Sequence, residues 1–462
     1  MSMGKYVLNN IALRSWWLAP FACVEGIGEE QRRVRSLTKE EFNLLCMCDG
    51  EKDLEETDLL KSLLEKKFIR PAQEGEKPDS FLMPREYDNR CVPCMGINIT
   101  ERCNFNCIHC YEAVDNDIPR NEMSYEDCRR LLEEARDCGV QNVKITGGEP
   151  MIHKDFLKII RCVYENEMTV DRINTNAFFL TEELVDEIKA MDPHILFNVS
   201  YDGAGYHDRI RGKKGAEKDL LKKIKILVDK GFNVRAAMTL NRINQDAVWE
   251  TMKKMDELGV REFRIIRTSE VPRWVLNAGD ACLSPKEYFD SMVELCRDYA
   301  GSDLGIVLNV WHLVKVIPQH HIYALAAERC DAKDYRPDFP LCANARENIT
   351  VTPDGEVFPC TPSPGLFRAH GMQFGNVFKE GIREILQDSK YLSFVCRGVH
   401  AVRENDEKCG ACPYFTRCTG GCRLFALGLG GDVFGHDPTS CLFFEGGYAE
   451  KIKEALPGYR KI

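Results

Sequence analysis

Between residue 94 and about residue 310, short apolar runs alternate with longer segments in which apolar residues recur every three or four positions. The short runs have the length of buried strands, and the longer segments have the period of amphipathic helices. Six candidate strands follow one another: 95–100, 142–146, 170–174, 195–201, 233–240 and 262–267. Strands and helices that alternate in this way build a parallel α/β sheet, and six such units predict a partial (β/α)6 barrel of the TIM type.

Helix start signals support these units. Ser124 followed by Asp127, Thr181 before an apolar stripe, and Ser284-Pro285 followed by Glu287 each place a capping oxygen directly before a periodic segment. Loops after the strands of such barrels carry the active site, so the segment that follows the first strand is the first place to look for chemistry.

The first 88 residues have a different pattern, with short strand-like runs at 6–8, 21–24 and 33–35 before any helix. Thr38 and Glu41 then form a capping box, and a second helix places Leu59, Leu60, Leu63 and Leu64 on one stripe. Strands followed by helices in so short a segment predict a winged helix-turn-helix. The polar, proline-containing residues 73–84 are expected to be a linker.

After about residue 325 the chain becomes rich in glycine, proline and cysteine and loses its long periodic segments. Small domains with this composition are commonly held by metal rather than by an apolar core. We therefore expect three domains, with boundaries at 1–88, 89–325 and 326–462.

Composition narrows the classes of protein that this chain can be. The 462 residues are 44% hydrophobic and 29% charged with a net charge of −10, which disfavours nucleic-acid binding. No charged-then-apolar leader and no long apolar run is found, so we expect neither a membrane span nor secretion, and we expect a cytoplasmic location. In this setting 22 cysteines indicate metal or redox ligands rather than disulfides.

Three cysteines, Cys103, Cys107 and Cys110, follow the first predicted strand with gaps of three and two residues. A 4Fe-4S cluster offers four irons to thiolates, so three cysteines leave one iron open to another ligand. A zinc site needs four ligands in a closed tetrahedron, usually as two separated cysteine pairs, and fits this triplet poorly.

A second motif, Gly147-Gly148-Glu149, ends the second predicted strand. Glycines allow a ligand to approach the backbone, and a carboxylate accepts hydrogen bonds from an ammonium group. Together with the cysteine triplet, this motif resembles that of the radical S-adenosylmethionine (SAM) enzymes. The resemblance implies that SAM chelates the open iron, that residues 147–149 cradle its amine, and that its cleavage gives a 5′-deoxyadenosyl radical.

The same resemblance suggests further SAM contacts. Tyr111, next to the last cysteine, matches the aromatic residue that faces the adenine, although ordinary loop packing explains it as well. Asn174 and Ser200 end the third and fourth strands and match polar SAM contacts, and Arg211 matches a partner for the SAM carboxylate. No residue is identified as a catalytic acid, base or hydrogen donor.

The C-terminal cysteines form a third motif, which resembles the SPASM domain in all seven positions. The resemblance implies two auxiliary 4Fe-4S clusters, and three clusters in all. Cys409, Cys412, Cys418 and Cys441 would hold one auxiliary cluster, and Cys342, Cys360 and Cys422 would hold the other. Zinc ribbons are the alternative, but seven cysteines exceed one zinc site.

Two points about the cysteines stay open. The cluster of Cys342, Cys360 and Cys422 has only three ligands in this pattern, so either Cys330 or Cys396 completes it or one iron is free for a substrate thiolate. Cys91 and Cys94 form a CxxC before the barrel, where a linker pair is favoured over a ligand or redox role.

The N-terminal module contains 13 Lys plus Arg against 17 Asp plus Glu, so a DNA-binding surface is disfavoured. In architecture and position it resembles the PqqD-like RiPP recognition element, which binds the leader of a ribosomally made precursor peptide at a strand edge. A structural cap on the barrel is the alternative.

These resemblances imply a radical SAM/SPASM maturase that modifies such a peptide, by a thioether or another crosslink. The alternatives are a peptide epimerase, a sulfatase-maturing type of radical SAM enzyme, a small-molecule radical SAM enzyme, and a zinc-stabilised protein without catalysis. The radical SAM function also implies a reducing partner such as flavodoxin or ferredoxin.

Overall fold

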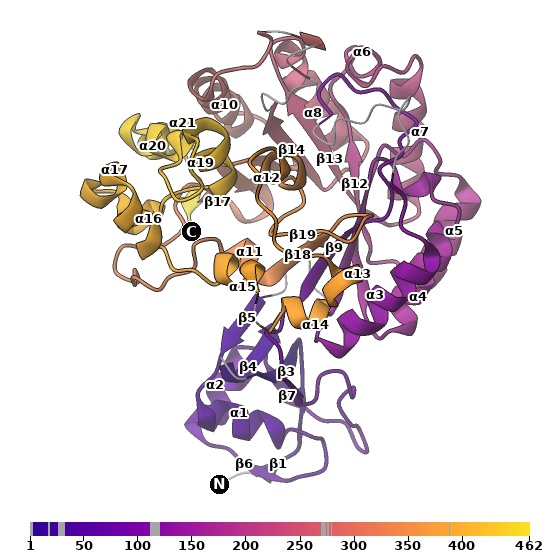
Figure 1. The fold of residues 1–462 in the computed structure, drawn as a ribbon, viewed down its shortest axis with the longest axis vertical. Helices are drawn as coiled ribbons and strands as arrows, with labels where there is room; N and C mark the ends of the chain where they lie inside the picture. The colour runs from indigo at the N-terminus through magenta and orange to yellow at the C-terminus, as the bar shows by residue number, and fades with distance from the viewer. Residues whose placement is uncertain are drawn as a thin grey trace.

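In the computed structural model of the chain, six parallel strands form the centre of one sheet (Figure 1). They are β9 (Cys94–Asn98), β10 (Asn142–Thr146), β11 (Thr169–Thr175), β12 (Leu196–Ser200), β13 (Asn233–Leu240) and β14 (Glu262–Arg267). Each strand pairs in parallel with the next, which confirms the predicted partial barrel. The structure describes residues 3–16, 19–25, 33–110, 121–268, 274, 277–278, 280–387 and 389–462.

Helices connect these strands and cover the outside of the barrel (Figure 1). They are α3 (Tyr125–Asp137), α4 (Phe156–Glu165), α5 (Glu182–Met191), α6 (His207–Arg211), α7 (Ala216–Asp229), α8 (Val248–Glu257) and α10 (Pro285–Ala300), with a 3-10 turn, η1 (Pro150–Ile152). Ser124 caps α3, Thr181 caps α5, and Ser284 with Glu287 forms a capping box on α10, as the sequence predicted.

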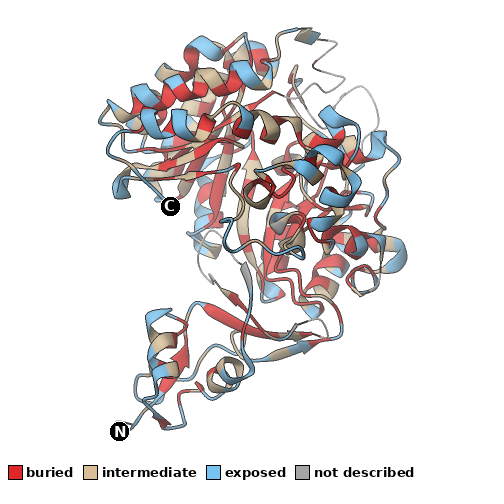
Figure 2. Cartoon of the chain, turned by 90° about the vertical axis from the view of Figure 1, so that its left-hand side faces the viewer, coloured by how far each residue is buried: buried red, intermediate tan, exposed pale blue. Residues whose placement is uncertain are grey.

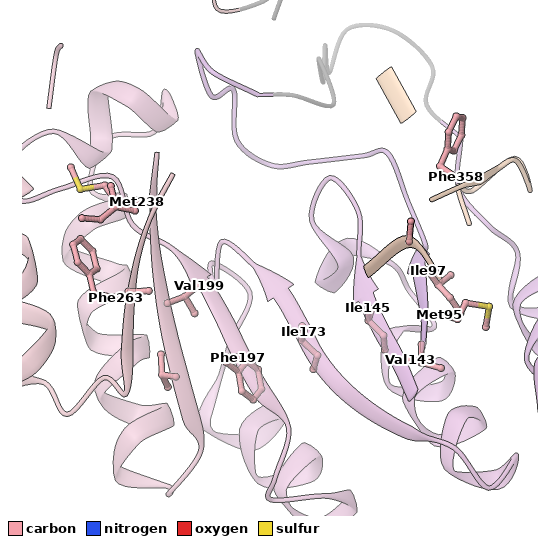
Figure 3. Packing of buried hydrophobic residues seen from close by; sticks show 14 of the residues in the cluster. Met95, Ile97, Val143, Ile145, Ile173, Phe197, Val199, Met238, Phe263 and Phe358 are labelled. Atoms are coloured by element: carbon pink, nitrogen blue, oxygen red, sulfur yellow. The ribbon is translucent and has the colours of Figure 1, made fainter. Parts of the chain in front are cut away.

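The two faces of the barrel sheet differ in polarity. Ile97, Ile145, Ile173 and Phe197 are fully buried in the main apolar core (Figure 3). Alternate positions on the same strands are polar or charged, and alternation places them on the other face. Both faces of a parallel sheet are usually apolar, so the polar inner face is suited to a polar ligand.

Further short strands extend the barrel sheet at both edges. Next to β9 lie β18 (Asn348–Val351) and β19 (Val357–Phe358). Beyond β14 lie β15 (Val307–Val310), β16 (Val314–Ile317), β17 (Ile322–Leu325) and the terminal β20 (Arg460–Lys461). The sequence analysis did not predict these edge strands, which are only two to four residues long.

Short helices make up most of the remaining C-terminal segment. They are α11 (Ala343–Glu347), α12 (Pro364–Ala369), α13 (Val377–Glu380), α14 (Ile382–Ile385), α15 (Lys390–Val395), α16 (His400–Asn405), α17 (Glu407–Ala411), α18 (Phe415–Cys418), α19 (Arg423–Gly430), α20 (Pro438–Glu445) and α21 (Tyr448–Ala455). Phe358, Phe367, Phe374 and Phe394 pack with ring centroids 5.1–6.5 Å apart, in the same core as the barrel. The C-terminal segment thus has more apolar core than its composition suggested.

The N-terminal module has its own apolar core and lies below the barrel in the view of Figure 1. Its main sheet has the order β5 (Arg33–Ser36), β4 (Ala19–Glu25), β3 (Ile11–Trp16), β8 (Arg85–Tyr87). Two small sheets pair β1 (Met3–Gly4) with β6 (Leu54–Glu55) and β2 (Tyr6–Leu8) with β7 (Ile69–Pro71). The helices are α1 (Lys39–Cys46), with the predicted capping box, and α2 (Asp58–Glu65).

The last residues of the segment expected to be a linker pack against the module. Arg14 donates hydrogen bonds to the carbonyl oxygens of Phe81 and Met83, and Leu82 and Met83 pack against the module core. In Figure 2 buried residues run along the strands of both the module and the barrel, with mostly exposed residues on the connecting turns. An ion pair of 3.0 Å between Arg85 and Glu167 joins the module to the barrel.

Among the described residues, no helix is long and apolar enough to cross a membrane.

Candidate iron-sulfur and cofactor site

Cys103, Cys107 and Cys110 lie in the loop that follows β9, at the edge of the sheet where the parallel strands end. Burial, and after it the neighbouring thiols of Cys107 and Cys110, raise the pKa of the Cys103 thiol to about 12. Three thiols that lie close to one another and are buried or half-buried are costly to ionise without a cation, and a metal centre supplies that charge. The chemistry of this donor set therefore fits an iron-sulfur cluster.

An apolar cluster shelters these thiols. Phe105, Cys107 and Ala216 are buried together, and Cys103, Cys110 and Phe178 pack against them. The rings of Phe105 and Phe178 meet edge to face, 5.9 Å apart. The loop is thus shielded from water on this side, which suits an oxygen-sensitive and strongly reducing centre.

Gly147 and Gly148 are required by the close approach of the cysteine loop. The backbone N–H of Gly148 donates to the Thr100 carbonyl at 2.7 Å, and that of Glu149 donates to the Arg102 carbonyl at 2.8 Å. A Cβ on Gly148 would lie 2.3 Å from the Arg102 carbonyl oxygen, so any other residue would displace the loop. The glycines therefore fix residues 147–149 beside Cys103.

The Glu149 carboxylate is fully buried and bonded to the chain itself. It accepts hydrogen bonds from Thr175 Oγ1 at 2.7 Å, from the Asn176 backbone N–H at 2.7 Å and from the Met151 N–H at 3.2 Å. The side chain thereby ties the end of β10 to the end of β11. Because three donors of the chain already bind its carboxylate oxygens, Glu149 offers a ligand mainly its backbone groups.

Burial raises the pKa of Glu149 to about 7, against 4.5 for an ordinary glutamate. Because the folded chain holds this proton more tightly than the unfolded chain, the resulting stabilisation is complete below about pH 4.5 and is lost as the pH rises to about 7. We expect the melting temperature of the wild type to fall relative to that of Glu149→Gln between about pH 4.5 and 7. Scanning fluorimetry across this range tests this, with the exposed Glu187→Gln as control. Parallel curves for the wild type and Glu149→Gln would contradict the assignment.

Arg211 is held by two partners at the cysteine loop. Its Nε lies 2.5 Å from Asp202 Oδ2, and its Nη1 donates to the Cys107 sulfur at 3.6 Å. These contacts leave Nη2 and the second N–H of Nη1 for a SAM carboxylate. Burial raises the pKa of Asp202, but the Arg211 guanidinium and His109 outweigh it and hold this pKa below its usual range.

Asp202 is fully buried and anchors Arg211. Asp202 Oδ1 accepts a hydrogen bond from the Thr239 N–H at 2.9 Å, and His109 Nε2 lies 3.7 Å from Oδ2. The backbone N–H of Ile108 donates to the Ile210 carbonyl at 3.0 Å. Helix α6 thus clamps the cysteine loop from the side opposite residues 147–149.

Asn174 and Ser200 lie half-buried near the ends of β11 and β12, where the sequence placed them. Tyr111 lies outside the described residues. The sequence analysis missed Asn176, whose Nδ2 donates to Asn104 Oδ1 at 2.8 Å and lies 3.9 Å from the Cys103 sulfur. Its position two residues after Asn174 was the only signal in the sequence.

In the C-terminal segment, four cysteines line one small pocket: Cys409, Cys412, Cys418 and Cys441. Cys342, Cys360 and Cys422 form a separate group, in which burial and then the thiols of Cys422 and Cys342 raise the pKa of Cys360. Among the described residues, no three His, Cys, Asp or Glu lie close enough to bind one ion, as a zinc ribbon requires.

The two candidates for a fourth ligand lie in different surroundings. Burial raises the pKa of the Tyr391 hydroxyl, and the thiols of Cys396, Cys360 and Cys342 are close enough to raise it further. The Cys330 thiol instead donates to the Asp331 carbonyl at 3.1 Å, and its charged neighbours are Asp334, Asp331 and Arg336. The structure therefore places Cys396 on the side of Cys342 and Cys360.

Cys91 and Cys94 are buried, with the Cys91 thiol donating to the Gly139 carbonyl at 3.4 Å. Neither they nor any other of the 22 cysteines forms a disulfide.

A sheltered triplet of thiols lies at the end of a partial barrel, and the C-terminal segment holds two further groups of cysteines. Together these groups define an iron-sulfur enzyme with more than one centre. Family comparisons give its class. Residues 97–255 match the radical SAM superfamily, and residues 342–413 match the SPASM iron-sulfur cluster-binding domain. The chain is a radical SAM/SPASM enzyme related to RiPP maturases, and it binds SAM and iron-sulfur clusters.

Three relatives illustrate the range of this family. The AdoMet-dependent heme synthase of Methanosarcina barkeri is 26% identical, over 75% of this chain and 95% of its own. The antilisterial bacteriocin subtilosin biosynthesis protein AlbA of Bacillus subtilis is 26% identical, over 71% of this chain and 66% of its own. The PqqA peptide cyclase of Granulibacter bethesdensis is 24% identical, over 76% of this chain and 88% of its own.

Two solved structures share the fold. SuiB of Streptococcus suis, bound to its precursor peptide SuiA, superposes with a TM-score of 0.67 at 16% identity, over 95% of this chain and all of SuiB. Native anSMEcpe with bound AdoMet superposes with a TM-score of 0.57 at 15% identity, over 78% of this chain and 98% of its own.

Proposed function

We propose that this chain is a peptide maturase that binds the leader of a ribosomally made precursor on its N-terminal module and crosslinks the peptide. One observation carries the proposal. The fold shared with SuiB covers 95% of this chain, whereas that shared with anSMEcpe covers 78%, and the difference is close to the size of the N-terminal module. One structure of SuiB holds its precursor peptide SuiA.

The module offers an edge on which a peptide can add as a strand. β5 ends the sheet order, and β4 is its one neighbour among the described strands. The Leu37 N–H donates to the Phe21 carbonyl, so alternation turns the N–H groups of Val34 and Ser36 away from β4. Main-chain hydrogen bonds at such an edge give affinity without requiring a particular side chain.

In this proposal residues 1–88 recognise the leader, residues 89–325 form the SAM barrel and residues 326–462 form the SPASM domain. Three 4Fe-4S clusters are held as the sequence implies, by Cys103, Cys107 and Cys110, by Cys409, Cys412, Cys418 and Cys441, and by Cys342, Cys360 and Cys422. Residues 147–149, Asn174 and Ser200 orient SAM, while Asp202 and Arg211 hold the cysteine loop in place.

SAM and the clusters supply the 5′-deoxyadenosyl radical and accept the second electron that a crosslink must lose. The chain's own residues bind and orient the peptide and exclude water. The apolar cluster of Phe105 and Phe178 covers the thiols, and a bound leader raises the local concentration of the peptide at the barrel. A thioether is the crosslink we favour, with another crosslink or an epimer as the alternative. The free thiols of the chain accord with a cytoplasmic enzyme.

We expect Ser36→Pro to weaken leader binding about tenfold, because it removes one outward N–H from the β5 edge and leaves the β4 pairing intact. Ser36→Ala keeps the N–H and is the matched control. Fluorescence anisotropy of the full chain with labelled peptides encoded beside its gene measures the dissociation constant. If both variants bind as the wild type does, the leader does not dock on β5.

A small-molecule enzyme is the second candidate, because the heme synthase relative matches 75% of this chain at 26% identity. A sulfatase-maturing type remains an alternative as well, since anSMEcpe shares the fold. Leader binding by the full chain separates both from the maturase.

A further inference from the structure

Helix α7, on the outside of the barrel (Figure 1), presents a row of lysines to solvent. Lys218, Lys222 and Lys225 are exposed and follow at intervals of four and three, so they share one face, and Lys214 lies just before the helix. The opposite face is buried through Leu220, Ile224 and Leu227. The lysines therefore extend from a helix whose backbone is held in place by its buried face.

This surface is strongly positive on an otherwise acidic chain. Residues 208–230 contain nine Lys plus Arg and four Asp plus Glu, whereas the whole chain has a net charge of −10. Two of those four carboxylates, Asp208 and Glu217, accept hydrogen bonds from the backbone N–H groups of Gly215 and Gly205. Among the described residues no ion pair joins Lys214, Lys218 or Lys222 to a carboxylate.

The lysine row begins beside the candidate SAM cluster. Lys213 Nζ lies 5.0 Å from the centre of the Phe178 ring, and Phe178 packs against the buried cluster of Phe105, Cys107 and Ala216. Lys223 Nζ donates to the Leu180 carbonyl, which ties α7 to the same loop. The neighbouring Phe179 is 39% exposed, an unusual position for so large an apolar side chain.

The surface thus has an exposed aromatic ring and unpaired positive charge. It also offers an electron a short route through Phe178 to the thiols of the cysteine loop. A positive rim around a small apolar contact steers an acidic protein and allows it to leave again. We propose that this face of α7, with Phe179, is the docking surface for an acidic one-electron carrier protein of the flavodoxin class. The proposal rests on the radical SAM function described above.

The step at this surface moves a single electron. It leaves the reduced carrier, which becomes oxidised by one electron, and it reduces the centre held by Cys103, Cys107 and Cys110. No bond is made or broken. The carrier then dissociates, so a modest affinity that depends on salt is expected rather than a permanent complex.

The double variant Lys218→Glu/Lys222→Glu tests this surface in the full, reconstituted enzyme. Binding of oxidised flavodoxin, measured by calorimetry, should weaken at least about tenfold, and wild-type binding should weaken as salt is raised. The matched control, Lys390→Glu/Lys453→Glu, reverses two exposed lysines of the C-terminal segment and should bind as the wild type does.

Stopped-flow reduction separates docking from chemistry. The α7 variant should be reduced more slowly by flavodoxin hydroquinone but at the wild-type rate by dithionite, a small reductant that needs no docking surface. Equal flavodoxin affinity for the α7 variant and the control, or loss of leader-peptide binding instead of flavodoxin binding, would overturn the proposal. A failure of 5′-deoxyadenosine formation by the wild type with dithionite would count against the radical SAM function itself, whatever the flavodoxin affinity.

Discussion

Replacing Cys103 by alanine is expected to reduce 5′-deoxyadenosine formation by more than about 100-fold, because losing one of three thiolates removes the centre that holds SAM. The total iron should fall from about 12 to about 8 per chain, since the two auxiliary clusters have their own ligands. Iron content and 5′-deoxyadenosine, measured after anaerobic reconstitution with SAM and dithionite, give both values.

Cys46→Ala is the matched control for this experiment, because Cys46 is a half-buried thiol on α1 of the N-terminal module. It should keep the iron content and the activity of the wild type. Unchanged activity in Cys103→Ala, or zinc in place of iron in the wild type, would show that the triplet is not the SAM centre.

The second large effect is expected at Asp202. Replacing it with asparagine leaves the buried Arg211 without its counter-charge, and breaking a buried ion pair from one side costs about 3–5 kcal/mol. The melting temperature should fall by about 5 °C or more. Because Arg211 also contacts Cys107, iron retention after desalting should fall with it.

Asp229→Asn is the control for Asp202→Asn, because it removes a carboxylate from an exposed pair with Lys225 on the surface of α7. Exposed pairs of this kind contribute less than about 1 kcal/mol, so its melting temperature should stay near that of the wild type. A similar melting temperature for the two variants would mean that Asp202 does not anchor Arg211.

The barrel strands could be predicted from sequence because each is a short apolar run between helices with clear caps. Ser124, Thr181 and Ser284 begin helices where expected, since capping depends on residues three apart in the chain. The edge strands β18 to β20 could not be predicted. Each has at most four residues, and β18 and β20 exist because the distant strands β9 and β17 offer their edges.

The cysteine motifs were visible in the sequence because their spacing is itself the signal. The partners of Glu149 and Arg211 could not be predicted from the sequence. Thr175, Asn176 and Asp202 come from other parts of the chain and meet these residues only in the fold. The packing of residues 81–83, at the end of the expected linker, could not be predicted for the same reason: Arg14, far away in the chain, binds carbonyl groups there.

Co-expression of the full chain with the short peptides encoded beside its gene, followed by mass spectrometry, tests the central claim most directly. The maturase proposal predicts that one peptide loses two hydrogen atoms when a crosslink forms, and that Cys103→Ala abolishes the change. Peptides that return with unchanged mass and unchanged stereochemistry, from an enzyme that still forms 5′-deoxyadenosine, would contradict the claim.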